Sequence, residues 1–195
     1  MTTLPSVVGL AGQAGSGKDT AAQWFVERGY TKDSFSAPIK RMLNQAFGFS
    51  TSDWEDRRWK ESEDALLAMD SYGHTRCTTP RRLAQWLGTE VVRNNFGNDA
   101  WVNLWKEKWW YQGQPRVVVA DVRFQNEVDA LHKCGGIVIR LTRGAYSGKL
   151  HFHEDERTDV VHDSERTGEL HNIDYHVAND GTIPELYEEL GRRFA

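Results

Sequence analysis

Residues 6–18 read Ser-Val-Val-Gly-Leu-Ala-Gly-Gln-Ala-Gly-Ser-Gly-Lys, and this stretch decides the fold. Its first half is a short apolar run, which is typical of a buried parallel strand. Its second half, from Gly12 to Lys18, has the spacing glycine, four residues, glycine, lysine that forms phosphate-binding loops. Ala21, Trp24 and Phe25 then recur at helical spacing before Gly29, a residue typical of helix ends. A strand–turn–helix unit therefore opens the chain.

Each part of this turn suits the binding of phosphate groups. Glycines permit backbone angles that point successive N–H groups inward, and the N-terminus of the following helix adds unpaired donors. Lys18 can reach the β and γ oxygens of a nucleoside triphosphate. The alternative, a glycine-rich turn with an incidental lysine, leaves the flanking strand and helix unexplained. We assign to nucleotide binding Gly12, Gly15, Ser16, Gly17, Lys18, Asp19 and Thr20.

The residue after Lys18 departs from the usual pattern. A Ser or Thr normally follows the lysine and binds Mg²⁺, but here Asp19 follows, with Thr20 behind it. We expect Asp19 to bind Mg²⁺ directly or through water, and Thr20 to donate to the α-phosphate. This departure disfavours GTPases and motor proteins, which use the hydroxyl directly.

The bulk composition indicates a soluble globular protein. The chain has 195 residues, 39% of them hydrophobic and 27% charged, which suits one domain with a sizeable core. The net charge of −4 argues against a protein that coats nucleic acid. Residues 1–8 lack the features of a signal peptide, and no apolar run approaches the ~18 residues of a membrane helix. We expect a cytoplasmic protein with small-molecule partners, no nucleic acid and no membrane.

The rest of the chain alternates strands with helices. Apolar runs predict further strands at 117–120, 137–141 and 175–178. Helices are predicted near 38–46, 53–64, 80–91, 99–110, 127–133 and 183–194. We expect the charged stretch 53–64 to be one solvated helix. In the helix that starts at Pro80, we expect one apolar face made of Leu83, Trp86, Leu87 and Val91. This alternation predicts an α/β fold with a parallel sheet.

Asp121 and Arg123 follow directly on the predicted strand 117–120. Because ligands bind outside the carboxyl ends of parallel strands, both side chains should face the crevice of the phosphate loop. The aspartate suits a hydrated Mg²⁺ or the acceptor, and the arginine suits a phosphate. The alternative is a pair that caps the next helix. Arg81, Arg82 and Arg93 flank a helix that also carries Trp86, and guanidinium groups beside an aromatic ring suit a phosphorylated planar base. The alternative is that each arginine is a solvated surface residue.

With these motifs in place, the chain resembles the phage-type deoxynucleoside monophosphate kinases, within the P-loop nucleotide kinases. The matching blocks follow in order along nearly the whole chain, and they include the unusual Asp19. They are residues 9–20, 37–40, 81–90, 94–96, 101–102, 121–123 with Glu127, 135–136 and 179–182.

The resemblance implies a three-layer P-loop kinase fold: a parallel sheet with helices on both faces, in one domain of residues 1–195. It implies a helical acceptor-binding insertion at about 37–112 and a lid at about 143–170. The implied reaction transfers the γ-phosphoryl group of ATP, with Mg²⁺, to a deoxynucleoside monophosphate, in the host cytoplasm if the protein is phage-encoded.

The resemblance also implies roles for individual residues. The catalytic candidates are Lys18, Asp121, Arg123 and Arg143. Asn179 and Gly181 lie in the loop that borders the adenine of ATP. The substrate-binding candidates are Lys40, Arg81, Arg82, Asn95, Trp101, Asp121, Arg123 and Glu127.

Several alternatives remain open at this point. The acceptor of a P-loop kinase could instead be of the dephospho-CoA or phosphomevalonate type, or the chain could be a non-catalytic nucleotide-binding regulator. A nucleic-acid-binding ATPase is disfavoured because no basic stripe is evident. His151, His153 and His162 suit an exposed polar segment better than a metal site. The tryptophans at 105, 109 and 110 favour packing or a homodimer contact over a base cage.

Overall fold

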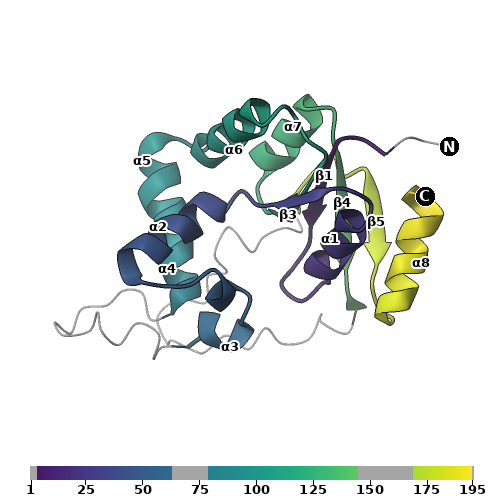
Figure 1. The fold of residues 1–195 in the computed structure, drawn as a ribbon, viewed down its shortest axis with the longest axis horizontal. Coiled ribbons are helices and arrows are strands. Elements are labelled where there is room, and N and C mark those ends of the chain that lie inside the picture. Colours follow the sequence, from purple (N-terminus) through teal and green to yellow (C-terminus); the bar gives the residue numbers. More distant parts are fainter. Residues whose placement is uncertain (1–3, 63–78, 145–168, 195) are drawn as a thin grey trace. The chain divides into compact units, whose positions relative to one another are not determined.

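The structure, a computed structural model, describes residues 4–62, 79–144 and 169–194. The chain divides into two compact units, one of Met1–Phe35 with Leu104–Ala195 and the other of Ser36–Asn103. The first unit contains the sheet, and the second is helical (Figure 1). The predicted insertion at about 37–112 overlaps the second unit but runs further, into residues that belong to the first. Most of the predicted lid, with His151, His153 and His162, lies outside the described residues.

The first unit is built on a five-stranded sheet. Its strands are β1 (Val7–Ala11), β2 (Thr31–Asp33), β3 (Val117–Val122), β4 (Ile137–Thr142) and β5 (Tyr175–Ala178). They lie in the order β2-β3-β1-β4-β5, and every pair is parallel. Since parallel strands all end at the same edge, the segments that follow them gather at one edge of the sheet.

Helices cover both faces of this sheet. On one face α1 (Lys18–Val26) and α8 (Ile183–Phe194) pack over Val8, Leu10 and Ile139 in one buried cluster. On the other face α7 (Gln125–Lys133) contacts β1 and β4. The prediction of an α/β fold with a parallel sheet between two layers of helices is confirmed.

Gly9 allows α7 to pack closely on the sheet. A Cβ at this position would collide with Cδ1 of Leu131 and would lie 3.0 Å from Cγ2 of Val122. Leu131 is fully buried, so its side chain fills the space that the glycine leaves. Close contact between α7 and β1 therefore depends on glycine at position 9, which has no side chain.

The second unit consists of helical segments: α2 (Ala37–Phe47), η1 (Ser52–Trp54), α3 (Arg57–Lys60), α4 (Pro80–Trp86), η3 (Leu87–Arg93) and α5 (Asn94–Phe96). The helix α6 (Ala100–Tyr111) begins in this unit and continues into the first. The core of the second unit includes Ile39, Leu43, Trp54, Leu83 and Trp101.

The prediction of one solvated helix over 53–64 was wrong. The described part forms two short helical turns, because the Asp56 side chain accepts hydrogen bonds from the amides of Arg58 and Trp59 and starts a new helix. Trp54 is buried, and its indole N–H donates to Oδ1 of Asn44 at 2.6 Å. Trp54 packs between Phe49 and Trp59, so this segment is anchored in the core although its neighbours in sequence are charged.

The helix that starts at Pro80 changes its winding at Leu87. Residues Leu87–Arg93 form a π-helix, in which each turn holds more residues than an α-helical turn. The indole N–H of Trp101 donates to the Gly88 carbonyl at 2.9 Å. The predicted apolar face was wrong at Trp86: Leu83 is buried, whereas Trp86, the last residue of the α-helical segment, is 43% exposed.

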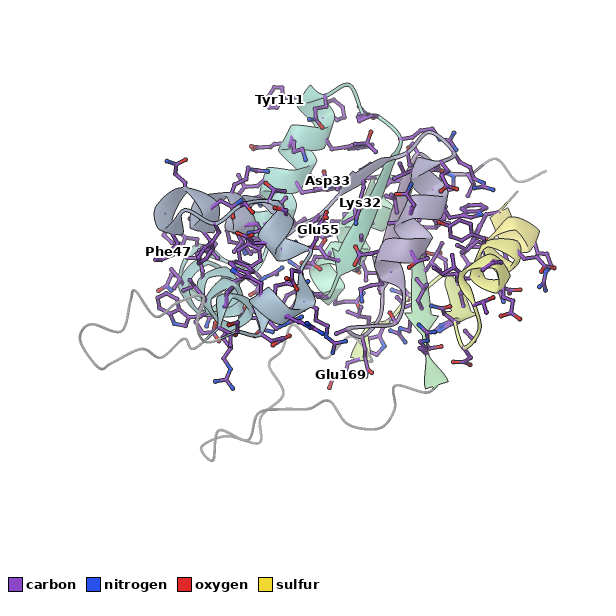
Figure 2. The ribbon with its side chains drawn as sticks, turned by 60° about the horizontal axis from the view of Figure 1, so that its bottom comes forward. Lys32, Asp33, Phe47, Glu55, Tyr111 and Glu169 are labelled. Atoms are coloured by element: carbon purple, nitrogen blue, oxygen red, sulfur yellow. The ribbon has the colours of Figure 1, made fainter. Side chains whose placement is uncertain are left out.

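Trp105 and Trp109 pack as predicted. Both are buried, their rings stack with centroids 5.9 Å apart, and the Trp109 indole donates to the Pro115 carbonyl. Trp110 and Tyr111 are exposed, and Tyr111 stands at the end of α6 in Figure 2.

Among the helices of the described residues, none combines the length and apolar composition of a membrane span.

The contact between α7 and the sheet gives the first prediction. Leu131→Ala should lower the free energy of unfolding by about 2–5 kcal/mol, because it empties a fully buried site. Gly9→Ala should lower it by about 1–3 kcal/mol, because the new methyl group collides with Leu131. The cost of Gly9→Ala should shrink on the Leu131→Ala background, where the methyl group gains room.

Urea unfolding followed by circular dichroism measures these differences. Lys133→Ala, an exposed position on the same helix, is the control and should change the free energy by less than about 0.5 kcal/mol. An equal cost of Gly9→Ala on both backgrounds contradicts the proposed packing.

Candidate functional site

Four segments with polar functional groups follow the carboxyl ends of the strands in the first unit. The phosphate loop follows β1, and Asp121 and Arg123 lie at the end of β3. Arg143 follows β4, and Asn179 follows β5. The parallel sheet therefore brings these four segments, which are far apart in the sequence, to the same edge of the sheet.

The phosphate loop has the backbone that its glycines were expected to permit. Gly12 and Gly17 have φ of 142° and 95°, in a region that L side chains rarely adopt. A Cβ at Gly12 would collide with the Leu141 carbonyl, and one at Gly17 would collide with Nδ2 of Asn179. Both positions therefore require glycine for conformation and for space.

Lys18 lies over this loop. Its Nζ donates to the carbonyls of Gly12 and Gln13, both at 2.7 Å. The ammonium group is thus positioned on the loop itself, at the N-terminus of α1. An ammonium at this place can bind phosphate oxygens that the loop amides also contact.

Ser16 provides a buried hydroxyl in the same loop. Its side chain is 3% exposed, and its Oγ finds no hydrogen-bond partner among the described residues. A buried polar atom without a partner is costly and usually indicates a ligand or water. The glycine cradle, Lys18 and this hydroxyl together suit the phosphate groups of a nucleotide.

Asn179 joins the end of β5 to the phosphate loop. Its buried side chain donates through Nδ2 to the Ser16 carbonyl at 2.9 Å, and its backbone N–H donates to the Thr142 carbonyl at 2.7 Å. The sequence placed Asn179 near adenine, which stays a prediction, and the structure adds a contact through which Asn179 holds the phosphate loop. No local pattern links positions 16 and 179, so only the folded sheet reveals it.

The loop after Asn179 also contacts the segment after β4. Arg143 Nη2 donates to the Gly181 carbonyl at 3.4 Å, and the amide of Gly144 donates to Oδ1 of Asp180. Glu185 accepts from the amide and the hydroxyl of Thr182, and these hydrogen bonds lower the pKa of its carboxyl group. Arg143 and Gly181, predicted separately, therefore lie side by side.

Asp121 is held by the chain that follows β2. Its Oδ2 accepts from Oγ of Ser34 at 2.9 Å, and its Oδ1 accepts from the amide of Phe35 at 2.8 Å. Phe35 is buried against Trp105. The carboxylate therefore has a fixed orientation at the end of β3, and the first unit passes into the second immediately after Phe35.

Glu127 shapes the turn that carries Arg123. Its buried carboxylate accepts from the amides of Arg123 and Phe124, at 2.7 and 3.1 Å, and so closes the N-terminus of α7. The helix-capping role that the sequence left open for Asp121 is thus performed by Glu127. Direct contact between Glu127 and an acceptor stays a prediction.

Asp19 lies in the first turn of α1 and is 85% exposed along its side chain. Lys32 of β2 donates to its Oδ1 at 2.8 Å. Lys32 has no signal in the sequence, because β2 is a polar strand of three residues with no apolar pattern. Among the described residues, no group of three histidine, cysteine, aspartate or glutamate side chains could hold a metal ion.

The other acceptor candidates lie in the second unit. Arg81 donates through Nε to Glu61 at 2.6 Å, and the amide of Arg82 donates to the capping hydroxyl of Thr79. Nζ of Lys40 lies 6.0 Å from the ring centre of Trp54. Arg82 is exposed, and the other two side chains are partly exposed, so they are accessible to a ligand.

Asn95 and Trp101 both contact the π-helix of this unit. Nδ2 of Asn95 donates to the carbonyls of Glu90 and Val91, at 2.9 and 2.8 Å, which fixes the orientation of its amide. Trp101 is 4% exposed and packs in the core of the unit. Roles for both in acceptor binding stay predictions.

Comparison with known proteins agrees with this geometry. Residues 71–190 match the sequence profile of a family described as deoxynucleotide monophosphate kinase. A relative from Acanthamoeba polyphaga mimivirus, provisionally named as such a kinase, is 30% identical over 94% of this chain and 93% of its own length. The deoxynucleotide monophosphate kinases of Enterobacteria phage T4 and Escherichia phage RB69 are 28% and 33% identical over 56% of this chain. These matches span 43% and 42% of the phage enzymes.

Solved structures with similar folds also match, and two of them have low sequence identity to this chain. One is a Thermus thermophilus protein, 17% identical with a TM-score of 0.47, which covers 98% of this chain and 97% of its own. The other is a dephospho-CoA kinase from Campylobacter jejuni, 12% identical with a TM-score of 0.49, over 96% and 94%.

The link between Asn179 and the phosphate loop gives the second prediction. Asn179→Ala should lower the free energy of unfolding by about 1–3 kcal/mol, because it leaves the Ser16 carbonyl without its donor. Urea unfolding measures the loss. Asn103→Ala, at an exposed position of α6, is the matched control and should change stability by less than about 0.5 kcal/mol. Equal stabilities of the two variants contradict a role for Asn179 in holding the loop.

Proposed function

The chain belongs to the deoxynucleotide monophosphate kinase family, and on that premise we propose that it transfers the γ-phosphoryl group of ATP to a deoxynucleoside monophosphate. The products are ADP and the deoxynucleoside diphosphate. One observation carries the proposal: the phosphate loop with Lys18 lies at the same sheet edge as Asp121 and Arg123. Donor and acceptor groups for a phosphoryl transfer therefore share one edge.

We assign the ATP phosphates to the loop formed by residues 12–20. Ser16 supplies a buried hydroxyl, and the glycines leave room for phosphate oxygens against the backbone. Asn179 and Gly181 border the adenine, and Asp19 is the candidate ligand of Mg²⁺, directly or through water. Mg²⁺, when bound with ATP, neutralises charge on the β- and γ-phosphates.

The residues of the chain then act by position and charge. A phosphate oxygen of the acceptor is already a nucleophile, so no covalent enzyme intermediate is needed. Lys18 moves with the transferring phosphoryl group, and Arg123 and Arg143 bind phosphate oxygens at the edge. Asp121, held by Ser34 and Phe35, orients the acceptor or a hydrated Mg²⁺. Fixed donors of this kind stabilise charge in the transition state without reorganisation.

Further acceptor contacts are proposed for Lys40, Arg81, Arg82, Asn95, Trp101 and Glu127. Each matches a position of the family pattern in the sequence. The protein is also proposed to work in the cytoplasm on nucleotides alone, with no nucleic acid partner. A homodimer through the exposed Trp110 and Tyr111 is the oligomeric state to test by light scattering.

The activity is tested by a coupled assay of ADP release with Mg·ATP. The panel of acceptors comprises dGMP, dTMP, dCMP, dAMP and the matching ribonucleotides, and chromatography identifies the diphosphate product. We expect diphosphate from at least one deoxy acceptor. Lys18→Ala should lower turnover by at least about 100-fold, because it removes the cation that follows the transferring phosphoryl group.

Lys133→Ala is the control for this variant, since it removes a lysine from the far end of α7. It should keep full activity. ATP binding without transfer to any monophosphate would indicate an acceptor of another type or a nucleotide-binding regulator. Undiminished transfer by a folded Lys18→Ala protein would contradict the assignment of the phosphate loop.

A further inference from the structure

The edge strand β2 carries two ion pairs on opposite sides. Successive side chains of a strand point to opposite faces, so Lys32 and Asp33 face different helices. Lys32 binds Asp19 of α1 at 2.8 Å, and Asp33 binds Lys108 of α6 at 2.7 Å (Figure 2 labels Lys32 and Asp33). Both pairs lie within the first unit.

The two pairs differ in burial and in geometry. Asp33 is only 11% exposed along its side chain and accepts from Lys108 with both oxygens, at 2.7 and 2.8 Å. Lys32 and Asp19 are 45% and 85% exposed and are joined through one oxygen. The first pair therefore anchors β2 to α6, whereas the second is an exposed pair of the kind that exchanges partners easily.

Asp19 is placed where a negative charge is unfavourable for nucleotide binding. It follows the phosphate-loop lysine directly, in the first turn of α1. A triphosphate bound to the loop repels a carboxylate in the first turn of α1, unless a cation lies close to both groups. Mg²⁺ is one such cation, and the ammonium group of Lys32 is a second.

We propose that Lys32 is the charge partner of Asp19 that sets how strongly nucleotide binding depends on Mg²⁺. The inference rests on the nucleotide site described under the proposed function. Lys32 neutralises Asp19 when no divalent ion is bound, and Asp19 would depend less on Lys32 if Mg²⁺ were bound beside it with ATP. A lysine suits the exchange, because its flexible stem holds a point charge without a fixed coordination geometry.

Isothermal titration calorimetry of the full chain tests the proposal, with ATP titrated in EDTA and in excess Mg²⁺. Lys32→Met should weaken binding of metal-free ATP by about fivefold, the size of an exposed charge interaction near a protein surface. It should weaken binding of Mg·ATP by less than about twofold, because Mg²⁺ then neutralises Asp19. The ratio of the affinity for Mg·ATP to the affinity for metal-free ATP should therefore be higher in the variant than in the wild-type chain.

Three further variants isolate the interaction. On the Asp19→Asn background, Lys32→Met should lose its effect on metal-free ATP, as expected for two residues that act through each other. Lys32→Arg keeps the charge and should keep the wild-type ratio. Lys133→Met removes the same charge from the last residue of α7, a helix that packs on β1 and β4, and it should leave the ratio unchanged. Thermal unfolding verifies that each variant is folded.

An unchanged ratio in Lys32→Met, or an equal effect of this variant with and without Asp19, overturns the proposal. Either result leaves the kinase assignment intact, because that assignment depends on diphosphate formation. Conversely, ATP binding with the expected ratios but no transfer to any monophosphate supports the role of Lys32 and contradicts only the proposed reaction. Absence of any ATP binding by the wild-type chain overturns both.

Discussion

The parallel pairing of β1 between β3 and β4 is the constraint on which the rest of the structure depends. It brings the carboxyl end of β1, which leads into the phosphate loop, beside the end of β3, which carries Asp121. It also places Asn179 at the end of β5 within reach of Ser16, although the two residues are far apart in sequence. Gly9 is part of this constraint, because a side chain there would push α7 away from the central strand.

The polar residues at this edge fall into two groups with different tasks. Asn179 and Glu127 are buried and hold backbone groups, so their hydrogen bonds fix the shape of the loops. Lys18 and Asp19 are more exposed and carry charges that a nucleotide and Mg²⁺ can engage. This division fits a site that works by preorganised charge, because buried hydrogen bonds keep the charged groups in position before the ligand arrives.

The sequence predicted the layers of the fold and most of the edge, because apolar strands and glycine spacing are local signals. It missed β2, whose residues Thr31–Asp33 are polar and owe their strand conformation to pairing with β3. It also missed the π-helix Leu87–Arg93, since the extra residue per turn is stabilised by contacts such as that of Trp101 with the Gly88 carbonyl. The contacts of Asn179 with Ser16 and of Lys32 with Asp19 join segments that only tertiary structure brings together.

The central claim is that ATP and a deoxynucleoside monophosphate bind together, with their phosphates in line. The most direct measurement is calorimetric binding of a bisubstrate analogue, in which adenosine and a deoxynucleoside are joined 5′ to 5′ by five phosphates. We expect this analogue to bind at least about 100-fold more tightly than ATP, because one molecule occupies both sites at a single cost in association entropy. An affinity no higher than that of ATP would contradict simultaneous binding and, with it, direct transfer between the two nucleotides.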